Sequence, residues 1–256
     1  MKIISIANQK GGVGKTTTAV NLSTALAAVG RRVLLVDLDP QGNASTGVGV
    51  FEKQDRKGSY EVLCGLTKVS EVAIKTRITH LDLLLASPDL AGAEIELVEQ
   101  SEREFFLKKA FSGCQNDYDY IIIDCPPTLG LLTLNALSAS GSVLIPLQCE
   151  FYALDGLSRL IKTIHYAQSY LNPDLKLEGI VMTMYDKRSS LSDQVAQDAK
   201  KHFGGYVFDS IIPRNTKVSE APSFGHPVLI YDVKSPGSMA YMKLAGELLT
   251  KHGVHA

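Results

Sequence analysis

Runs of apolar residues alternate with amphipathic stretches from one end of the chain to the other. Several runs carry hydrophobic residues at consecutive positions, as in Ile121-Ile122-Ile123, which is typical of parallel strands covered on both faces. The runs predict strands at residues 3–7, 33–37, 81–86, 120–124, 142–147, 177–183 and 207–212. Apolar residues at helical spacing predict helices at residues 15–29, 89–100, 102–111, 129–138, 154–170, 191–202 and 238–251.

The repeated order of strand and then helix favours an α/β fold, with a doubly wound, mostly parallel sheet and helices on both faces. The chain has 256 residues, of which 45% are hydrophobic and 21% charged. This length and composition suit a single domain over residues 1–256 with a well-buried core. The stretch 41–58 is rich in glycine and polar residues, so we expect a loop there that can switch conformation.

Composition narrows the classes of function. The formal net charge is -1, so bulk charge would not coat nucleic acid, and any DNA binding must come from a local patch. The four cysteines form no C-x-x-C pair, which favours scattered reduced thiols over a zinc site or a disulfide framework. No apolar stretch is long enough to span a bilayer and no signal peptide is evident, so we expect a cytoplasmic protein.

The strongest motif follows the first predicted strand and opens the first predicted helix, with the sequence Lys10-Gly11-Gly12-Val13-Gly14-Lys15-Thr16-Thr17. Glycines allow a tight turn whose N–H groups approach phosphate oxygens, and the helix N-terminus adds partial positive charge. Lys15 is placed to reach the β- and γ-phosphates, and the Thr16 hydroxyl to ligate Mg²⁺. The strict phosphate-loop pattern would have glycine at Gln9, and a second lysine, Lys10, lies just inside the loop.

Two predicted strands end in aspartate. The strand at 33–37 leads into Asp37-Leu38-Asp39-Pro40, and the period of two puts Asp37 and Asp39 on the same side. The apolar run at 120–123 ends at Asp124, a Walker B pattern whose carboxylate would hold Mg²⁺, usually through water. Solvated strand-end aspartates are the competing interpretation, but ligands of such folds bind at this edge of the sheet.

Together these motifs resemble the ParA/Soj branch of the ParA–MinD ATPases, over nearly the whole chain. Residues 10–17 are similar to the deviant Walker A motif of that family. Residues 37–43 resemble its switch I segment, and residues 123–127 its Walker B motif and the start of switch II. The late segment resembles the partition branch in particular, with the sequences Ile212-Pro213-Arg214-Asn215 and Ser219-Glu220-Ala221-Pro222-Ser223.

The resemblance implies an ATPase that uses ATP and Mg²⁺ and yields ADP. Lys10 would be the signature lysine that crosses to the partner subunit's nucleotide in an ATP-bound sandwich dimer. Lys15 would bind phosphate, Asp39 would position the attacking water, and Asp124 would support Mg²⁺. The metal ligands would then be Thr16, Asp39 and Asp124. The resemblance also implies that Pro213 and Asn215 lie near adenine.

The resemblance also implies partners. Arg188 and Lys217 match family positions implicated in non-specific binding of double-stranded DNA, and a ParB-type partner would stimulate hydrolysis by the homodimer at the nucleoid. The charges of the sequence alone do not decide whether these basic residues bind DNA. Acidic residues are interleaved with the basic residues of the last third, so a mixed solvated face is equally compatible with the sequence. Thr183-Met184-Tyr185-Asp186 lacks the Asn and Lys of N-K-x-D, which weakens a guanine-binding interpretation.

Three alternatives remain open at the level of sequence. A MinD-like membrane ATPase needs a basic amphipathic C-terminal helix, whereas residues 241–251 favour a helix packed on the sheet, and no membrane partner is expected. A nitrogenase-reductase-like protein would bridge an iron–sulfur cluster with cysteines, and Cys125 and Cys149 do not match that pattern. A non-catalytic scaffold would not require Asp39 and Asp124.

Overall fold

The computed structural model describes residues 1–51, 56–151 and 153–254. Its sheet has the strand order β3-β4-β2-β5-β1-β6-β7-β8, and all neighbouring strands are parallel except the β3–β4 pair. The strands are β1 Lys2–Ile6, β2 Val33–Asp37, β3 Ile74–Lys75, β4 Leu81–Leu84, β5 Tyr120–Asp124, β6 Ser142–Gln148, β7 Lys176–Tyr185 and β8 Val207–Pro213. The predicted doubly wound, mostly parallel sheet is therefore confirmed.

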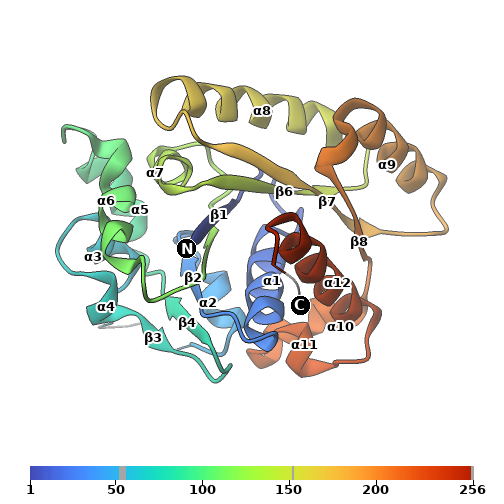
Figure 1. Cartoon of the computed structure of the whole chain (residues 1–256), viewed down its shortest axis with the longest axis horizontal. Coiled ribbons are helices and arrows are strands. Elements are labelled where there is room, and N and C mark those ends of the chain that lie inside the picture. The colour runs from blue at the N-terminus through green and yellow to red at the C-terminus, as the bar shows by residue number, and fades with distance from the viewer. Residues whose placement is uncertain (52–55, 152, 255–256) are drawn as a thin grey trace.

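Helices cover both faces of this sheet (Figure 1). The α-helices are α1 Lys15–Ala28, α2 Asn43–Gly47, α3 Ser59–Leu63, α4 Val69–Val72, α5 Leu90–Glu96, α6 Phe106–Phe111, α7 Leu131–Ala139, α8 Ala153–Tyr170, α9 Ser190–Phe203, α10 Thr216–Glu220, α11 Val228–Tyr231 and α12 Pro236–Lys251. Short 3₁₀ turns, among them η1 Arg103–Phe105 and η4 Ala221–Phe224, lie between them.

Two apolar clusters sandwich the sheet. One contains residues of α7, α8 and α9, and the other contains residues of α1, α11 and α12. Successive residues of β2 alternate between the clusters, with Leu34 and Val36 in the first and Val33 and Leu35 in the second. This alternation explains the uninterrupted apolar runs in the sequence, because both faces of a central strand are removed from water.

The structure corrects several element predictions. Helix α2 lies within the stretch 41–58 that was expected to be a loop, and residues 52–55 of that stretch lie outside the described residues. The helix predicted at 89–100 ends at Glu96, and the one predicted at 102–111 begins with the 3₁₀ turn η1. The antiparallel strand β3 and the short helices α3, α4, α10 and α11 were not predicted. Each has only two to five residues, too few to give a readable period.

Helix α12 packs on the sheet, as its apolar spacing predicted. Its buried residues include Tyr241, Leu244 and Leu248, and it contacts α1 and β8. None of the helices formed by the described residues combines the length and apolarity needed to cross a bilayer.

Candidate nucleotide site

The phosphate loop connects β1 to α1 at the carboxyl edge of the sheet, where β1 lies between β5 and β6. Gly12 and Gly14 have φ of 75° and 89°, in the left-handed region that favours glycine. A Cβ built on Gly11 or Gly12 would meet no atom within 4 Å, so the loop backbone is open on that side. Gly14 caps α1 without any side-chain hydrogen bond, which leaves the first N–H groups of this helix available to an anion.

Side chains from neighbouring strands fix the loop in place. Asn8 donates from Nδ2 to the carbonyl oxygen of Pro146 at 2.8 Å and accepts from the backbone N–H of Lys10 at 3.0 Å. On the other side, the Thr183 hydroxyl donates to the carbonyl oxygen of Val13 at 2.8 Å. The loop is thus tied to β6 and β7, so its N–H groups keep their direction before any ligand binds.

The two lysines of the loop have different surroundings. Lys15 is buried, and its ammonium donates to the carbonyl oxygen of Lys10 at 3.0 Å. Burial lowers the pKa of Lys15, while Asp124, Cys125 and Asp39 oppose part of that shift. The Lys10 side chain is 40% exposed and forms an ion pair with Glu150. Lys15 therefore faces into the site, and Lys10 lies on its rim.

Asp37 and Asp124 lie opposite each other at the ends of β2 and β5. The Asp37 carboxylate accepts from the backbone N–H and the hydroxyl of Ser45, each at 2.7 Å, and from the N–H of Asp39 at 3.4 Å. Asp37 therefore fastens α2 and the segment that carries Asp39 to the end of β2. This role was not predicted, although the Asp-x-Asp spacing singled the residue out.

Asp39, which is 9% exposed, lies just beyond the end of β2. Its carboxylate accepts from the backbone N–H of Gln41 at 3.0 Å. This short turn holds the carboxylate close to the chain, at the edge of the sheet where the phosphate loop begins. Asp39 also contributes to the electrostatics of both Lys15 and Asp124, so these three charged groups share one site.

Asp124 is fully buried, and neither of its carboxylate oxygens has a hydrogen-bond partner of ordinary geometry among the described residues. Burial and the nearby Asp37 raise its pKa well above the usual range, and the neighbouring Thr16 and Lys15 offset only part of that shift. A divalent cation would supply the missing countercharge, so the residues present fit Mg²⁺.

Among the described residues, no three His, Cys, Asp or Glu side chains gather as a metal cluster. Mg²⁺ bound near Thr16 and Asp124 would therefore take most of its ligands from nucleotide and water, as is usual for this ion.

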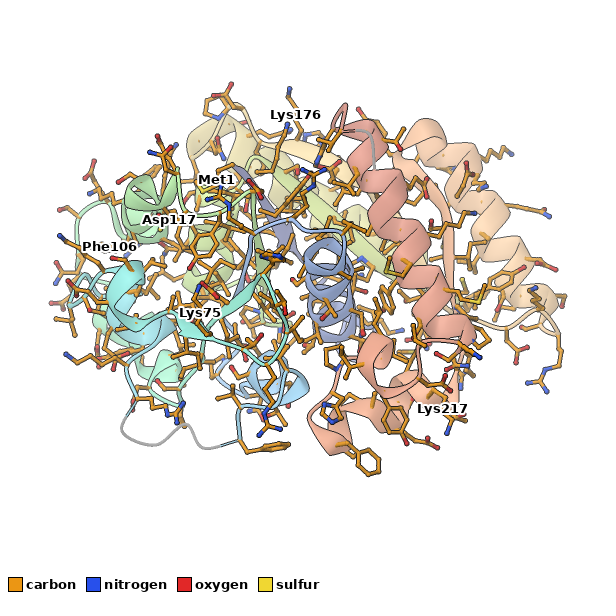
Figure 2. All side chains as sticks on the ribbon, turned by 60° about the horizontal axis from the view of Figure 1, so that its bottom comes forward. Met1, Lys75, Phe106, Asp117, Lys176 and Lys217 are labelled. Atoms are coloured by element: carbon orange, nitrogen blue, oxygen red, sulfur yellow. The ribbon has the colours of Figure 1, made fainter. Side chains whose placement is uncertain are left out.

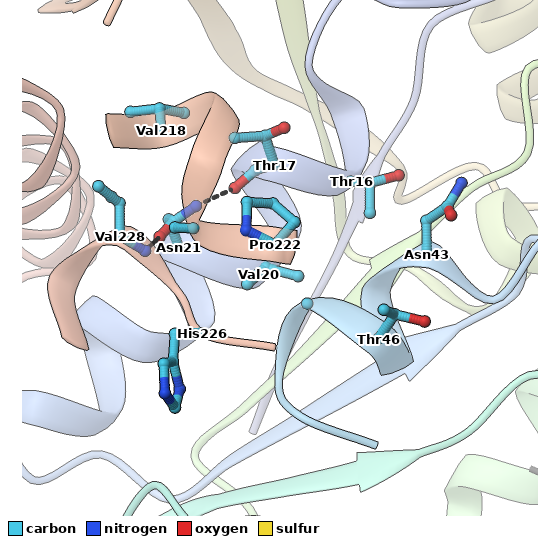
Figure 3. Close-up of a pocket in the computed structure, with 12 residues that line it drawn as sticks. Thr16, Thr17, Val20, Asn21, Asn43, Thr46, Val218, Pro222, His226 and Val228 are labelled. Carbon is cyan, nitrogen blue, oxygen red and sulfur yellow. Dashed lines mark hydrogen bonds between the residues drawn. The ribbon is translucent and has the colours of Figure 1, made fainter. Parts of the chain in front are cut away.

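A pocket of about 280 Å³ opens beside the first turns of α1 (Figure 3). Asn21 forms part of its wall, donating to the carbonyl oxygen of Thr17 and accepting from the N–H of Val228, both at 2.8 Å. The lining comes from α1, α2 and the segment from α10 to α11, and consists of Thr16, Thr17, Val20, Asn21, Asn43, Thr46, Gly47, Val218, Ala221, Pro222, His226 and Val228. Most of these residues were not predicted as site residues.

The two residues expected near adenine lie at the start of this segment. Pro213 ends β8, and Asn215 caps α10 by accepting from the N–H of Val218 at 3.3 Å. Neither lines the pocket beside α1, but Asn215 fixes the helix whose Val218 does. Their contact with adenine stays a prediction.

Of the two cations expected to contact DNA, Arg188 is exposed and Lys217 is partly exposed, and each is paired with a neighbouring carboxylate. Arg188 donates from Nε and Nη2 to the Asp186 carboxylate at 3.0 and 2.8 Å. Lys217 pairs with Glu220 at 3.1 Å, and its ammonium lies 5.5 Å from the centre of the Tyr231 ring. Figure 2 shows Lys217 at the periphery of the molecule. Two of the acidic residues interleaved with these cations in the sequence, Asp186 and Glu220, thus form ion pairs with them.

A phosphate loop after β1, strand-end aspartates on β2 and β5, and a mostly parallel sheet covered on both faces define a P-loop nucleotide-binding protein. A family model described as an AAA domain matches residues 1–177. The chain is 53% identical to the chromosome partitioning protein ParA of Caulobacter vibrioides, over 98% of this chain and 95% of that protein. It is 52% identical to the sporulation initiation inhibitor protein Soj of Bacillus subtilis, over 96% of this chain and 98% of that protein. The chain belongs to the ParA/Soj family of chromosome-partitioning proteins.

Solved structures agree with this assignment of the fold. A structure named cobyrinic acid a,c-diamide synthase, from Mycobacterium smegmatis and with bound ADP and magnesium, is 40% identical. Its TM-score is 0.87, and the match covers 99% of this chain and 96% of that one. The cell division ATPase MinD of Pyrococcus furiosus is 27% identical with a TM-score of 0.79, over 98% of this chain and 99% of that one.

Proposed function

We propose that this protein is an ATP-dependent DNA-partitioning ATPase whose ATP-bound form is a sandwich dimer that binds DNA without sequence preference. The observation that carries the proposal is the different placement of the two lysines in one phosphate loop. Lys15 is buried at the site, whereas Lys10 lies on its solvent-facing rim, where a second subunit can be reached. The names of the relatives, which are chromosome partitioning proteins, support the same function.

In this proposal, the residues of the loop hold the nucleotide. Lys15 and the N–H groups of residues 11–17 bind phosphate oxygens, and Thr16 and Asp124 hold Mg²⁺. When bound, Mg²⁺ would supply the countercharge for Asp124, and the nucleotide would supply the phosphate bond that is hydrolysed. Asp39 orients the attacking water, and Lys10 stabilises charge on the partner subunit's phosphates.

DNA binding would be coupled to the nucleotide by dimerisation. Arg188 and Lys217 contact phosphates of the duplex, which carry no sequence information by themselves. A single copy of such a small patch binds weakly, whereas two linked copies bind far more tightly through their effective concentration. Hydrolysis, stimulated by a ParB-type partner, would reopen the dimer and release DNA near the nucleoid. The cycle therefore requires that the dimer bind DNA better than the monomer.

The alternatives are less well supported. A MinD-like membrane function needs a free apolar helix face, but most large apolar residues of α12, among them Tyr241, Leu244 and Leu248, are buried where the helix packs on α1 and β8, and the exposed ones are two methionines, Met239 and Met242. A shared iron–sulfur cluster needs accessible thiolates, but Cys125 and Cys149 are buried, which raises their pKa to about 12 and about 11. A scaffold without hydrolysis gives no reason for two buried carboxylates, Asp39 and Asp124, in one site.

The proposal is tested by measuring molar mass with sedimentation velocity, with Mg²⁺ and either ADP or a non-hydrolysable ATP analogue. The wild-type protein should double its mass with the analogue only. Lys10→Ala should keep nucleotide binding and remain monomeric, because its own loop still binds phosphate but nothing crosses to the partner. A dimer of Lys10→Ala as tight as that of the wild type would contradict the proposed role of Lys10.

A further inference from the structure

Glu150 stands out because it pairs with the functional cation on the rim of the phosphate loop. Its carboxylate forms an ion pair with the ammonium of Lys10, and the two side chains are 35% and 40% exposed. Pairs with this degree of exposure are weak, because water solvates both groups when they separate. Such a contact holds a side chain at rest but yields to a stronger anion.

Local hydrogen bonds fix the backbone of Glu150, so its carboxylate can follow Lys10 only as far as its own side chain reaches. Its N–H donates to the carbonyl oxygen of Gln148 at 2.9 Å, and its carbonyl oxygen accepts from the N–H of Ala153 at 3.0 Å. These bonds form the turn between β6 and α8. The same stretch of chain is tied to the phosphate loop, because β6 pairs with β1 and Pro146 accepts from Asn8. When Lys10 extends toward a partner, it has to leave this carboxylate.

Lys10 is also held through its backbone, by a contact that phosphate would disrupt. The ammonium of Lys15 donates to the carbonyl oxygen of Lys10 at 3.0 Å. A phosphate group in the loop competes for this ammonium, because a charged acceptor binds it more strongly than a carbonyl does. Phosphate would therefore weaken both contacts that retain Lys10. Phosphate in the same subunit competes with the Lys10 carbonyl for the Lys15 ammonium, and phosphate of the partner subunit competes with Glu150 for the Lys10 ammonium.

We propose that Glu150 is a positioning residue that holds Lys10 in its own subunit at rest and releases it when the dimer closes on nucleotide. This rests on the proposed function, since it requires that Lys10 act in the partner subunit. Pairing neutralises Lys10, so two empty subunits gain nothing by exchanging lysines. The phosphates of a bound nucleotide bind the Lys10 ammonium more strongly than Glu150 does, so closure of the dimer depends on nucleotide.

The test is the dissociation constant of the dimer of Glu150→Gln, measured by sedimentation with Mg²⁺ and a non-hydrolysable ATP analogue over a range of protein concentrations. The amide keeps the shape of the side chain and removes its charge. With two such contacts per dimer, the dissociation constant should fall about five- to thirty-fold. Nucleotide affinity of the monomer, measured at protein concentrations too low for dimers, should not change. A dimer of equal or lower affinity would overturn the proposal.

A second comparison separates release of Lys10 from simple removal of a negative charge near the partner's phosphates. Glu150→Gln combined with Lys10→Ala should dimerise no better than Lys10→Ala alone, because there is no lysine to release. A gain that persists without Lys10 would overturn the proposal. Glu150→Asp, which keeps the charge, should stay close to wild type. If the wild-type protein forms no dimer at any concentration, the proposed function and this inference both fall. If only the variant's gain is missing, the proposed function stands.

Discussion

The nucleotide edge of the sheet and the surface carrying Arg188 and Lys217 are built in different ways. At the nucleotide edge, Lys15, Asp37 and Asp124 are buried, and strands β1, β2 and β5 fix their positions. Arg188 and Lys217 lie on a loop and a five-residue helix, and each is paired with a carboxylate two or three residues away. The side chains of the first region are held in fixed positions by the core, whereas those of the second region are held only by local ion pairs at the surface.

This difference predicts how each region responds to mutation. Buried charged groups lack water to compensate for a lost partner, so single changes there should have large effects. Exposed cations contribute to DNA binding through the number of phosphates that they neutralise, so single changes there should have small effects that depend on salt.

The largest effect is expected for Lys15→Ala. Lys15 is buried at the site, whereas the other lysine of the loop, Lys10, lies on its rim and is paired with Glu150. Charge-assisted bonds to phosphate are among the strong ones, so ATP affinity should fall about 100-fold. Titration calorimetry with ATP and Mg²⁺ measures this. Lys75→Ala is the matched control, since Lys75 is 88% exposed and lies on β3, far along the sheet order from β1. Affinity near wild type in Lys15→Ala would contradict the assignment of the phosphate loop.

The next effect concerns stability and its dependence on pH. The folded-state pKa of Asp124 is raised, so between the unfolded value near 3.8 and the folded value the native state binds more protons than the unfolded state. Its contribution therefore becomes unfavourable as pH rises through this window. Asp124→Asn should stabilise the nucleotide-free protein at neutral pH by about 1–3 kcal/mol, and this gain should vanish at low pH.

Thermal denaturation of the nucleotide-free protein over a pH series measures this gain. Asp117→Asn, at an exposed position, is the control and should leave the melting temperature unchanged. The same Asp124→Asn protein should lose Mg²⁺-dependent hydrolysis, so stability and activity should move in opposite directions. A lower melting temperature at neutral pH would mean that the Asp124 carboxylate is satisfied without an ion.

A smaller effect is expected for Arg188→Glu. Reversing one exposed charge in each subunit should weaken DNA binding by the ATP-state dimer about tenfold at moderate salt, and it should reduce the slope of affinity against salt. Arg77→Glu, at another exposed arginine, changes the net charge equally and serves as the control. Equal losses in both variants would show that net charge, and no local patch, governs binding.

The smallest effect is expected for Asp186→Asn, which removes the acid paired with Arg188. A freed arginine should raise DNA affinity about two- to fourfold, because exposed ion pairs contribute little. Glu102→Gln breaks a comparable exposed pair, with Lys109, and should leave DNA affinity unchanged. Fluorescence anisotropy with a labelled duplex at fixed salt resolves this difference. A loss of affinity in Asp186→Asn would indicate that the carboxylate orients Arg188 productively.

Much of the fold could be read from the sequence because its central strands are buried on both faces, and their apolar runs mark them clearly. Strands β2 and β5 were predicted with the observed bounds. Helix α2 was missed because a five-residue helix has a costly nucleus, and it forms here through the contacts of Ser45 with Asp37. Strand β3 was missed because two residues have no period.

The candidate site divides in the same way. The turn at residues 10–14 and the start of α1 at Lys15 could be predicted because the glycines, the lysine and the helix N-terminus are contiguous in the sequence. The pairing of Lys10 with Glu150 joins segments 140 positions apart and depends on β6 lying beside β1. Arg188 and Lys217 could be named only through family resemblance, because charge along the sequence does not separate a DNA surface from a solvated one.

The most direct measurement is DNA binding by the purified protein at fixed salt, without nucleotide and with ADP, ATP or a non-hydrolysable ATP analogue. We expect tight binding only with ATP or the analogue, and equal affinity for duplexes of unrelated sequence. Equal affinity in all four conditions, or no DNA binding in a protein that binds ATP, would contradict this expectation.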